Sequence, residues 1–165
     1  GSGELWITMG ISLKSGDNST NNMLIGEYKH SIDDKGRLAV PSKFRGALKG
    51  GAIVTRGLDH CLFLYEKSEW GPFAEKLKSL SIAKSNSRAF ARLMLAGAME
   101  VEIDVQGRIL IPDYLREYAG LKKLSVIAGL YNRLEIWDES SWQKYKAKTE
   151  ASGDEIAEQL DELGI

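Results

Sequence analysis

Apolar and polar residues alternate along short segments of the chain, which is typical of β-strands with one buried face. Glu100-Val101-Glu102-Ile103 shows this alternation directly. Apolar runs predict further strands near 52–56, 61–65, 124–128 and 133–137. Short helices are expected at 43–48 and 114–119, a mostly helical stretch at 73–96 and a further helix at 150–163. The mixture of both kinds of element predicts an α+β fold.

One short segment occurs twice. IDDKGRLAVPSKFR at 32–45 and IDVQGRILIPDYLR at 103–116 lie 71 positions apart, with Ile, Asp, Gly, Arg, Pro and Arg in register. The match resumes between GLDHCLFLYEKSEW at 57–70 and GLYNRLEIWDESSW at 129–142. A unit of about 45 residues buries too little apolar surface to be stable alone. We therefore expect two repeats that share one core as a pseudo-twofold pair.

The repeats divide the chain into five parts. We expect the first repeat at 27–71, a helical connector at 72–97 and the second repeat at 98–143. Lys84, Arg88 and Arg92 would share one face of the connector helix. An acidic helical tail should occupy 144–165. Residues 1–22 have the composition of a tag or polar leader, so we expect them to be disordered and the natural chain to begin at Met23.

Each repeat carries a D-x-x-G turn. Aspartate at the first position and glycine at the fourth suit a type I turn followed by a left-handed residue. Asp33 with Gly36, and Asp104 with Gly107, thus predict two hairpin loops. Return strands should follow at 37–40 and 108–111, ending at the prolines 41 and 112. Ser42 and Asp113 are then candidate caps of short helices.

Turn chemistry alone does not explain the arginine that follows each glycine. Arg37 and Arg108 begin their return strands, and we expect both side chains to be exposed. Asp33 and Asp104 lie four residues earlier and could pair with the guanidinium groups. An exposed ion pair contributes only about 0–1 kcal/mol, so orientation is a better reason for the pair than stability. An oriented guanidinium suits phosphate or guanine.

Charge is unevenly distributed, although the net charge of the 165 residues is −1. Residues 28–50 contain six Lys/Arg against two Asp, a local charge of +4. Residues 150–165 contain six Asp/Glu and no Lys or Arg, a local charge of −6. Local charge determines what a surface attracts. A solvated surface with an acidic end would explain the charges equally well.

The sequence argues against an enzyme and predicts no metal or cofactor. His30, His60 and Cys61 have no matching chemistry in the second repeat, and no phosphate-loop or zinc spacing occurs. Trp70 and Trp142 could stack on bases, but a core role is favoured. With a single cysteine, no internal disulfide can form. The apolar stretches are too short to span a membrane.

Several blocks resemble the MraZ family. MLIGEYKHSIDDKGRLAVPSKFR contains the D-x-x-x-R signature of that family at Asp33–Arg37, and Asp104–Arg108 repeats it. TRGLDHCLFLYEKSEW and AGLYNRLEIWDESSW are also similar to the family, over about 23–145. The resemblance implies two AbrB-like swapped-hairpin β-barrel repeats that form an intrachain pseudo-dimer with flanking helices.

The same resemblance implies a function. It indicates a sequence-specific DNA-binding transcriptional regulator, usually a repressor, of the division and cell-wall gene cluster. The partners would be closely spaced short direct repeats in promoter DNA and further copies of the chain in a ring-like homo-oligomer. Such a protein would be cytoplasmic and nucleoid-associated. An antitoxin-like module that binds another protein is the alternative, because swapped-hairpin folds also occur in antitoxins.

Ten residues are candidates for the DNA interface. Loop residues carried over from the family are Lys35, Gly36, Arg37, Gly107 and Arg108. Lys43, Arg45 and Gln106 complete the predicted contact surface, and Asp33 and Asp104 would orient the loops. Gln106 stands where the first loop has Lys35, so the second loop should attract phosphate less.

Overall fold

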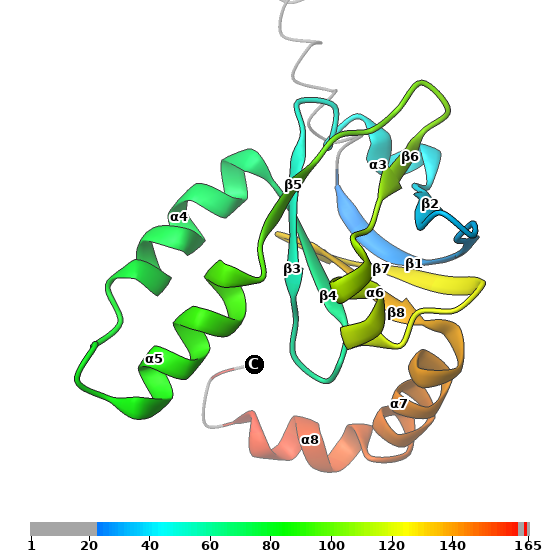
Figure 1. The fold of residues 1–165 in the computed structure, drawn as a ribbon. Helices are drawn as coiled ribbons and strands as arrows, with labels where there is room; N and C mark the ends of the chain where they lie inside the picture. The colour runs from blue at the N-terminus through cyan, green and yellow to red at the C-terminus, as the bar shows by residue number, and fades with distance from the viewer. Residues whose placement is uncertain (1–22, 162–163, 165) are drawn as a thin grey trace, which may run out of the picture.

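The computed structural model describes residues 23–161 and 164. The predicted tag or leader at 1–22 lies outside the described residues. A six-stranded antiparallel sheet runs in the order β1 (Leu24–Ser31), β7 (Leu124–Tyr131), β8 (Leu134–Asp138), β4 (Leu62–Glu66), β3 (Ala52–Arg56) and β5 (Met99–Val101). A second sheet pairs β2 (Arg37–Ala39) with β6 (Arg108–Leu110). The expected mixture of helices and largely antiparallel strands is confirmed (Figure 1).

Several strand pairs join one repeat to the other. β1 of the first repeat pairs with β7 of the second, and β5 of the second pairs with β3 of the first. The two return strands, β2 and β6, pair with each other. Within the first repeat, a single bridge between Ile32 and Leu38 joins the two arms of the loop. The return strands therefore form their ladder across the repeats, where the turn pattern alone predicted ordinary hairpins.

The main core lies where the repeats meet. Leu38 and Phe44 of the first repeat and Ile109 and Leu115 of the second are all at most 1% exposed and belong to one apolar cluster. Equivalent positions of the two repeats thus fill the same core. Removing this much apolar surface from water is the main favourable term of such a fold.

Two short helices follow the loops. α3 (Ser42–Arg45) and α6 (Asp113–Ala119) begin directly after Pro41 and Pro112. Neither Ser42 nor Asp113 caps its helix as predicted, because the prolines occupy the capping positions and no side-chain cap bond forms. The carbonyl oxygens of the prolines accept the first helical N–H bonds, at 2.9 Å from Phe44 and 3.1 Å from Leu115.

The connector folds as a helical hairpin rather than one long helix. α4 (Lys67–Lys78) ends before residues 79–84, and α5 (Ser85–Ala91) continues into a π-helical turn, η2 (Arg92–Ala96). The Ser79 hydroxyl donates to the carbonyl of Lys76 at 2.8 Å. This side-chain bond competes with a further helical bond and favours the end of α4 at this point. Lys84 is extended and precedes α5, so it does not share a helix face with Arg88 and Arg92.

A second apolar cluster joins this hairpin to the sheet. Leu77 and Met94 of the hairpin pack with Phe63 and Trp137 of the sheet. Trp70 and Trp142 are half-buried and pack against this cluster, as favoured over base stacking. In Figure 1 the hairpin covers one side of the sheet, away from β2 and β6.

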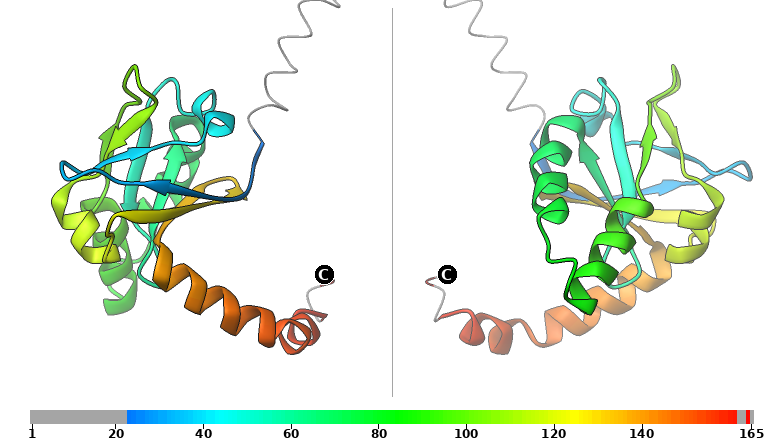
Figure 2. Two further views of the ribbon diagram at one scale, coloured as in Figure 1. Left: turned by 90° about the vertical axis from the view of Figure 1, so that its right-hand side faces the viewer. Right: turned by 60° about the vertical axis from the view of Figure 1, so that its left-hand side comes forward.

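The acidic end of the chain is helical and extends from the body. α7 (Glu139–Ala151) runs without a break across residue 144, where a tail was expected to start, and α8 (Gly153–Gln159) follows. Neither helix has a buried residue. Figure 2 shows α7 and α8 as an arm that leads away from the sheet.

Candidate nucleic-acid interface

The first loop has the predicted turn geometry. The N–H of Gly36 donates to the carbonyl of Asp33 at 3.0 Å, and the N–H of Asp33 donates to the carbonyl of Arg37 at 3.0 Å. Gly36 has φ +87°, the left-handed region that side chains with a Cβ rarely adopt. The turn thus directs the chain back toward β2 with Arg37 as its first residue.

The second loop repeats this geometry. Gly107 has φ +77°, its N–H donates to the carbonyl of Asp104 at 3.0 Å, and the N–H of Asp104 donates to Arg108 at 2.9 Å. The expected positive φ of both glycines is confirmed. Each loop therefore presents its arginine at the same point of the same turn.

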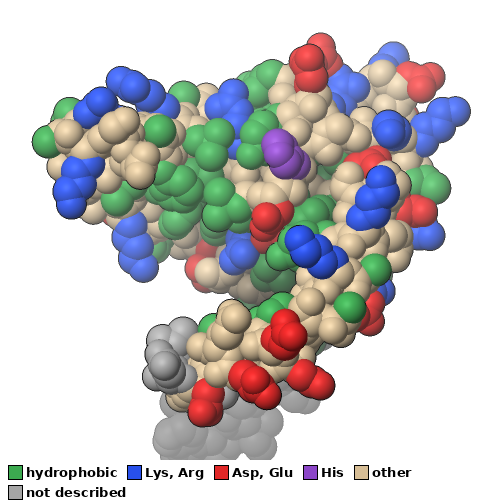
Figure 3. Space-filling model, turned by 90° about the horizontal axis from the view of Figure 1, so that it is seen from below, with side chains coloured by type: hydrophobic (Ala, Val, Ile, Leu, Met, Phe, Trp, Pro, Cys, Tyr) green, Lys and Arg blue, Asp and Glu red, His purple; other side chains and the backbone are tan. Residues whose placement is uncertain are grey.

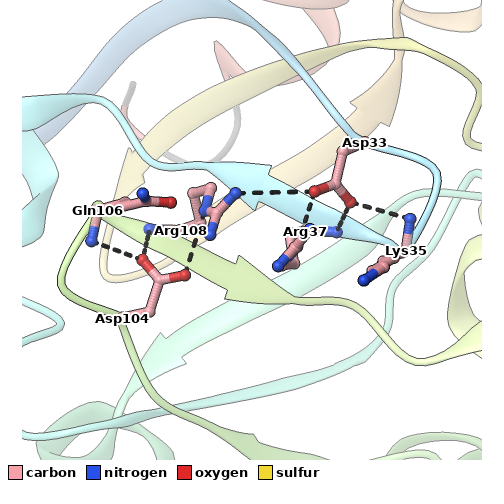
Figure 4. A network of polar contacts seen from close by, with 6 residues as sticks. All are labelled: Asp33, Lys35, Arg37, Asp104, Gln106 and Arg108. Atoms are coloured by element: carbon pink, nitrogen blue, oxygen red, sulfur yellow. Dashed lines mark hydrogen bonds and ion pairs between the residues drawn. The ribbon is translucent and has the colours of Figure 1, made fainter.

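An aspartate side chain organises each loop from within. Oδ1 of Asp33 accepts the N–H groups of Lys35 and Arg37 at 3.0 and 2.9 Å, and Oδ2 accepts Nε of Arg37 at 2.7 Å. Asp104 accepts from Gln106, Arg108 and Nε of Arg108 at 2.8, 2.9 and 3.1 Å. Each carboxylate thereby fixes both the turn and the direction of the guanidinium (Figure 4).

These bonds favour the ionised form of both carboxyl groups. The backbone N–H of the arginine lowers the pKa of Asp33 first, with the Arg37 side chain and Lys35 N–H adding to the effect. The pKa of Asp104 is lowered in the same way, by the N–H of Arg108 and then that of Gln106. The pKa values of both carboxyl groups are lowered in the folded chain. Their contribution to folding stability is therefore present at neutral pH and is lost only as the pH falls through the folded pKa values.

The two loops lie beside each other at the β2–β6 pair. Arg37 is opposite Leu110 in the ladder, and Arg108 is opposite Ala39. Nη1 of Arg108 lies 3.7 Å from Oδ2 of Asp33, so one carboxylate faces both arginines (Figure 4). The side chains of Arg37 and Arg108 are 36% and 27% exposed, less than expected from the sequence, because the paired strands and these aspartates cover part of each.

Each loop also rests on an arginine of the other repeat. A Cβ at Gly36 would lie 2.7 Å from Cζ of Arg116, and one at Gly107 would collide with the guanidinium of Arg45. Arg45 and Arg116 are equivalent in the two repeats. Each is held by its own repeat, because Nε donates to Val40 at 2.9 Å and to Ile111 at 3.0 Å respectively.

Backbone bonds tie the loops together in the same crossed way. The carbonyl of Gly36 accepts the N–H of Ile111 at 2.8 Å, and the carbonyl of Gly107 accepts the N–H of Val40 at 2.9 Å. The left-handed glycine of each loop therefore serves three purposes. It permits the turn, leaves room for the opposite arginine and brings its carbonyl to the opposite strand.

The remaining predicted residues fall into two groups. Lys35 and Gln106 are exposed at the loop tips. Lys43 is exposed on α3, with Nζ 5.9 Å from the ring centre of Tyr28, and Arg45 is half-buried beneath the second loop. The structure therefore brings the loop residues together, whereas Lys43 lies on the neighbouring helix.

Two residues at this surface were missed from the sequence. Arg116 was not proposed, although it recurs in register with Arg45 and supports the first loop. Val105 is fully exposed at the tip of the second loop, where the first loop has Asp34. The repeat alignment contained the signal for Arg116, whereas nothing in the pattern singled out Val105.

Comparison with known proteins determines the family. A family model described as "MraZ protein, putative antitoxin-like" matches residues 23–93 and again residues 94–163. The chain belongs to the MraZ family. The two matches together span most of the chain, and each contains one D-x-x-x-R loop.

Curated MraZ relatives agree with this assignment. The chain is 51% identical to a transcriptional regulator MraZ of Thermoanaerobacter pseudethanolicus over 143 residues, which cover 87% of this chain and all of the relative. It is 52% identical to a transcriptional regulator MraZ of Caldicellulosiruptor saccharolyticus, again over 143 residues that cover 87% of this chain and all of the relative. A Desulforamulus reducens regulator of the same name is 49% identical, covering 86% and 99%. These names support a role in transcriptional regulation.

Other features of the described residues are their potential metal ligands, the cysteine and the helices. Transcriptional regulators are generally not enzymes, and no His, Cys, Asp and Glu cluster suited to a metal occurs among the described residues. Cys61 is buried, its Sγ donates to the carbonyl of Leu58 at 3.1 Å, and desolvation raises its pKa far above the ordinary range. Among the described helices, none has the length and apolarity to cross a membrane.

Proposed function

We propose that the protein is a sequence-specific DNA-binding regulator that represses the division and cell-wall gene cluster. Arg37 and Arg108 would read base edges in short direct promoter repeats. The DNA sugar-phosphate backbone would be approached by Lys35, Gln106 and the loop glycines. The contact would be extended by Lys43 and Arg45. Such a protein would act in the cytoplasm on the nucleoid.

One observation carries this proposal: two arginines of like geometry are held side by side by carboxylates. Of the three side-chain nitrogens of Arg37, only Nε takes part in a hydrogen bond or ion pair with the described residues. Its two Nη groups are therefore available as a donor fork. A guanidinium fork matches O6 and N7 of guanine, and preorganisation limits the side-chain entropy lost on binding.

The strand pairs that cross between the repeats support the AbrB-like swapped-hairpin pseudo-dimer as part of this proposal. The two loops of one chain would then act as those of a dimer. Two arginines give little sequence discrimination, so several chains must bind neighbouring promoter repeats. We propose a ring-like homo-oligomer, because linked contacts raise the effective concentration of each further contact.

Protection mapping tests this function directly. The full chain would be bound to DNA from upstream of its own gene, and protected positions should form short, evenly spaced direct repeats. Affinity for that DNA should exceed affinity for a shuffled sequence by at least about 10³-fold. Equal affinity for both DNAs would contradict sequence-specific recognition.

The antitoxin-like description of the family supports a second candidate. The exposed acidic helix α8 could bind another protein. Stoichiometric capture of a second protein in the absence of DNA, with no specific promoter complex, would favour that alternative.

A further inference from the structure

A groove between α4 and α5 is apolar at its base and basic at its edge. It has a volume of about 270 Å³ and is lined by Leu77, Leu80, Ile82 and Leu95 together with basic side chains. Ile82 is 82% exposed, and Leu95 is 37% exposed. Apolar side chains that gather in an open groove indicate a contact surface more than an ordinary solvated one.

Two arginines along this groove have no ion-pair partner among the described residues. Arg88 and Arg92 line it from α5 and η2. Nη1 of Arg88 donates to the carbonyl of Ile82 at 2.9 Å, which directs this guanidinium along the groove wall. A partner that fits should therefore combine apolar side chains with carboxylates.

The end of the chain has this composition. Ile156 and Leu160 are four residues apart, so they share one face at the end of α8, and Ile156 is 40% exposed. Glu155 lies on the flank of the helix, about 100° around the axis from Ile156, whereas Glu158 lies about 160° from both apolar residues. Within the described part of the chain, no acidic residue of α8 is ion-paired.

We propose that the α8 helix of one chain lies in the α4–α5 groove of a second copy. Ile156 and Leu160 would cover Leu80, Ile82 and Leu95, and Glu155 would face Arg88 and Arg92. Figure 3 shows the acidic arm and the basic and apolar hairpin at separate places on the same side of one chain. No residue of α7 or α8 lines the groove of its own chain, and the uninterrupted α7 holds α8 at the end of the arm.

This contact would join two different surfaces of the same protein. Such a heterologous contact places chains head to tail, and a repeated contact closes a ring when the rotation permits. The inference thus specifies the contact behind the proposed self-assembly. It does not depend on DNA binding, since Figure 1 places the hairpin far from the β2–β6 loops.

Cross-linking of mixed variants tests which chain provides the helix. Ile82→Cys and Ile156→Cys would be made in separate full-length chains, mixed without DNA and oxidised; the native Cys61 is buried. We expect a cross-linked species with the mass of two chains, at least about fivefold above a control that pairs Ile82→Cys with Val105→Cys, whose position is fully exposed on the second loop. Fivefold corresponds to about 1 kcal/mol of preferred contact.

Two results of this experiment would overturn the inference. One is a cross-linked yield equal to that of the Val105→Cys control. The other is a chain carrying both cysteines that closes only on itself and keeps the mass of a monomer, because α8 would then occupy its own groove.

Charge exchange gives an independent measurement. Glu155→Lys and Arg92→Glu should each raise the concentration at which the assembly dissociates by about tenfold in light scattering, because each places like charges together. The two changes in one chain should restore assembly to within about threefold of the original. Glu158→Lys is the matched control and should leave assembly unchanged; circular dichroism checks that all variants fold.

The outcome separates this inference from the proposed function. Unchanged assembly in both single variants would contradict the docking of α8, whatever the DNA affinity. Lost DNA binding in these variants with assembly intact would also contradict it and would assign the groove to DNA. Intact assembly in a chain that binds no promoter DNA would contradict the proposed function alone.

Discussion

The two D-x-x-G loops share a backbone but differ at their tips. In both, the aspartate accepts two backbone N–H groups and the Nε of the arginine, and the glycine has positive φ. The tips contain Asp34 and Lys35 in the first loop but Val105 and Gln106 in the second. Both pairs of side chains are exposed.

This difference separates what the turn requires from what a ligand requires. Every residue whose side chain makes a turn bond, and the glycine that leaves room for the opposite arginine, is the same in both loops. The tip residues contribute only N–H groups to the turn, so folding does not restrict their side chains. Two equal scaffolds can therefore present different chemistry: the first tip carries two charged side chains, and the second carries one apolar and one neutral polar side chain.

Removing the two loop arginines, Arg37 and Arg108, should have the largest effect on the proposed DNA binding by both loops. Loss of one specific base contact costs about 1–3 kcal/mol, so Arg37→Ala with Arg108→Ala should abolish measurable promoter binding in an anisotropy titration. The fold should persist, because partly exposed ion pairs contribute about 0–1 kcal/mol.

Lys148→Ala, on the exposed face of α7, is the matched control and should bind normally. Undiminished promoter affinity of the double variant, with an unchanged circular dichroism spectrum, would remove the two arginines from the DNA interface.

Alanine at the loop glycines should affect folding as well as binding. A non-glycine residue at positive φ costs about 1–2 kcal/mol. Gly36→Ala and Gly107→Ala should each lower the melting temperature, because each Cβ would also meet the arginine of the other repeat, and the Cβ at Gly36 would lie 2.9 Å from the carbonyl oxygen of Ile111. Differential scanning calorimetry measures both variants.

Gly50→Ala is the control for the glycine variants. Its Cβ would meet no atom within 4 Å and its φ is not positive, so the melting temperature should stay at the original value or rise slightly. Equal melting temperatures for all three variants would show that the loop conformation is not strained by a side chain.

Periodicity and turn chemistry predicted most elements of the fold, but not the partners of the strands. Alternation identifies a strand because it reports a buried face, and D-x-x-G identifies a turn because only glycine fits there easily. The pairing of β2 with β6 depends on surfaces distant in the sequence, so no local pattern shows it. The break between α4 and α5 at 79–84 was not predicted either, because this segment contains neither proline nor glycine to mark a helix end.

The candidate site could be predicted as far as the repeat made it visible. Arg37 and Arg108 were found because a turn does not require them and both copies have them. The role of Arg116 depends on packing against the loop of the other repeat, which becomes apparent only in the folded chain. The same packing gives Arg45 a structural contact that its position in a basic segment did not suggest.

The crossed arginines offer a way to separate the loops. Arg116→Ala should weaken promoter binding by about three- to tenfold through the first loop, and Arg45→Ala should do so through the second. If Arg116 positions Arg37, its effect should largely vanish in the Arg37→Ala background and persist in the Arg108→Ala background. A double-mutant cycle measured by anisotropy gives both coupling energies.

Salt dependence distinguishes positioning from direct contact in this cycle. Loss of a phosphate contact reduces the slope of log affinity against log salt by about 1. Loss of an arginine that only packs against a loop leaves the slope unchanged. Equal coupling of Arg116 to both loop arginines, or a reduced slope, would contradict the crossed support.

The smallest expected effect comes from exchanging the tips. Lys35→Gln should reduce the salt slope by about 1, and Gln106→Lys should increase it by about 1, because each changes one positive charge near the DNA backbone. Neither change disturbs the turn, since the aspartates accept backbone N–H groups at these positions rather than side chains. A chain carrying both changes should regain the original slope if the two loops are equivalent scaffolds at equal distance from phosphate. A slope that responds at residue 35 but not at residue 106 would show instead that the loops approach DNA differently, and that the apolar tip with Val105 meets a base edge or protein rather than the backbone.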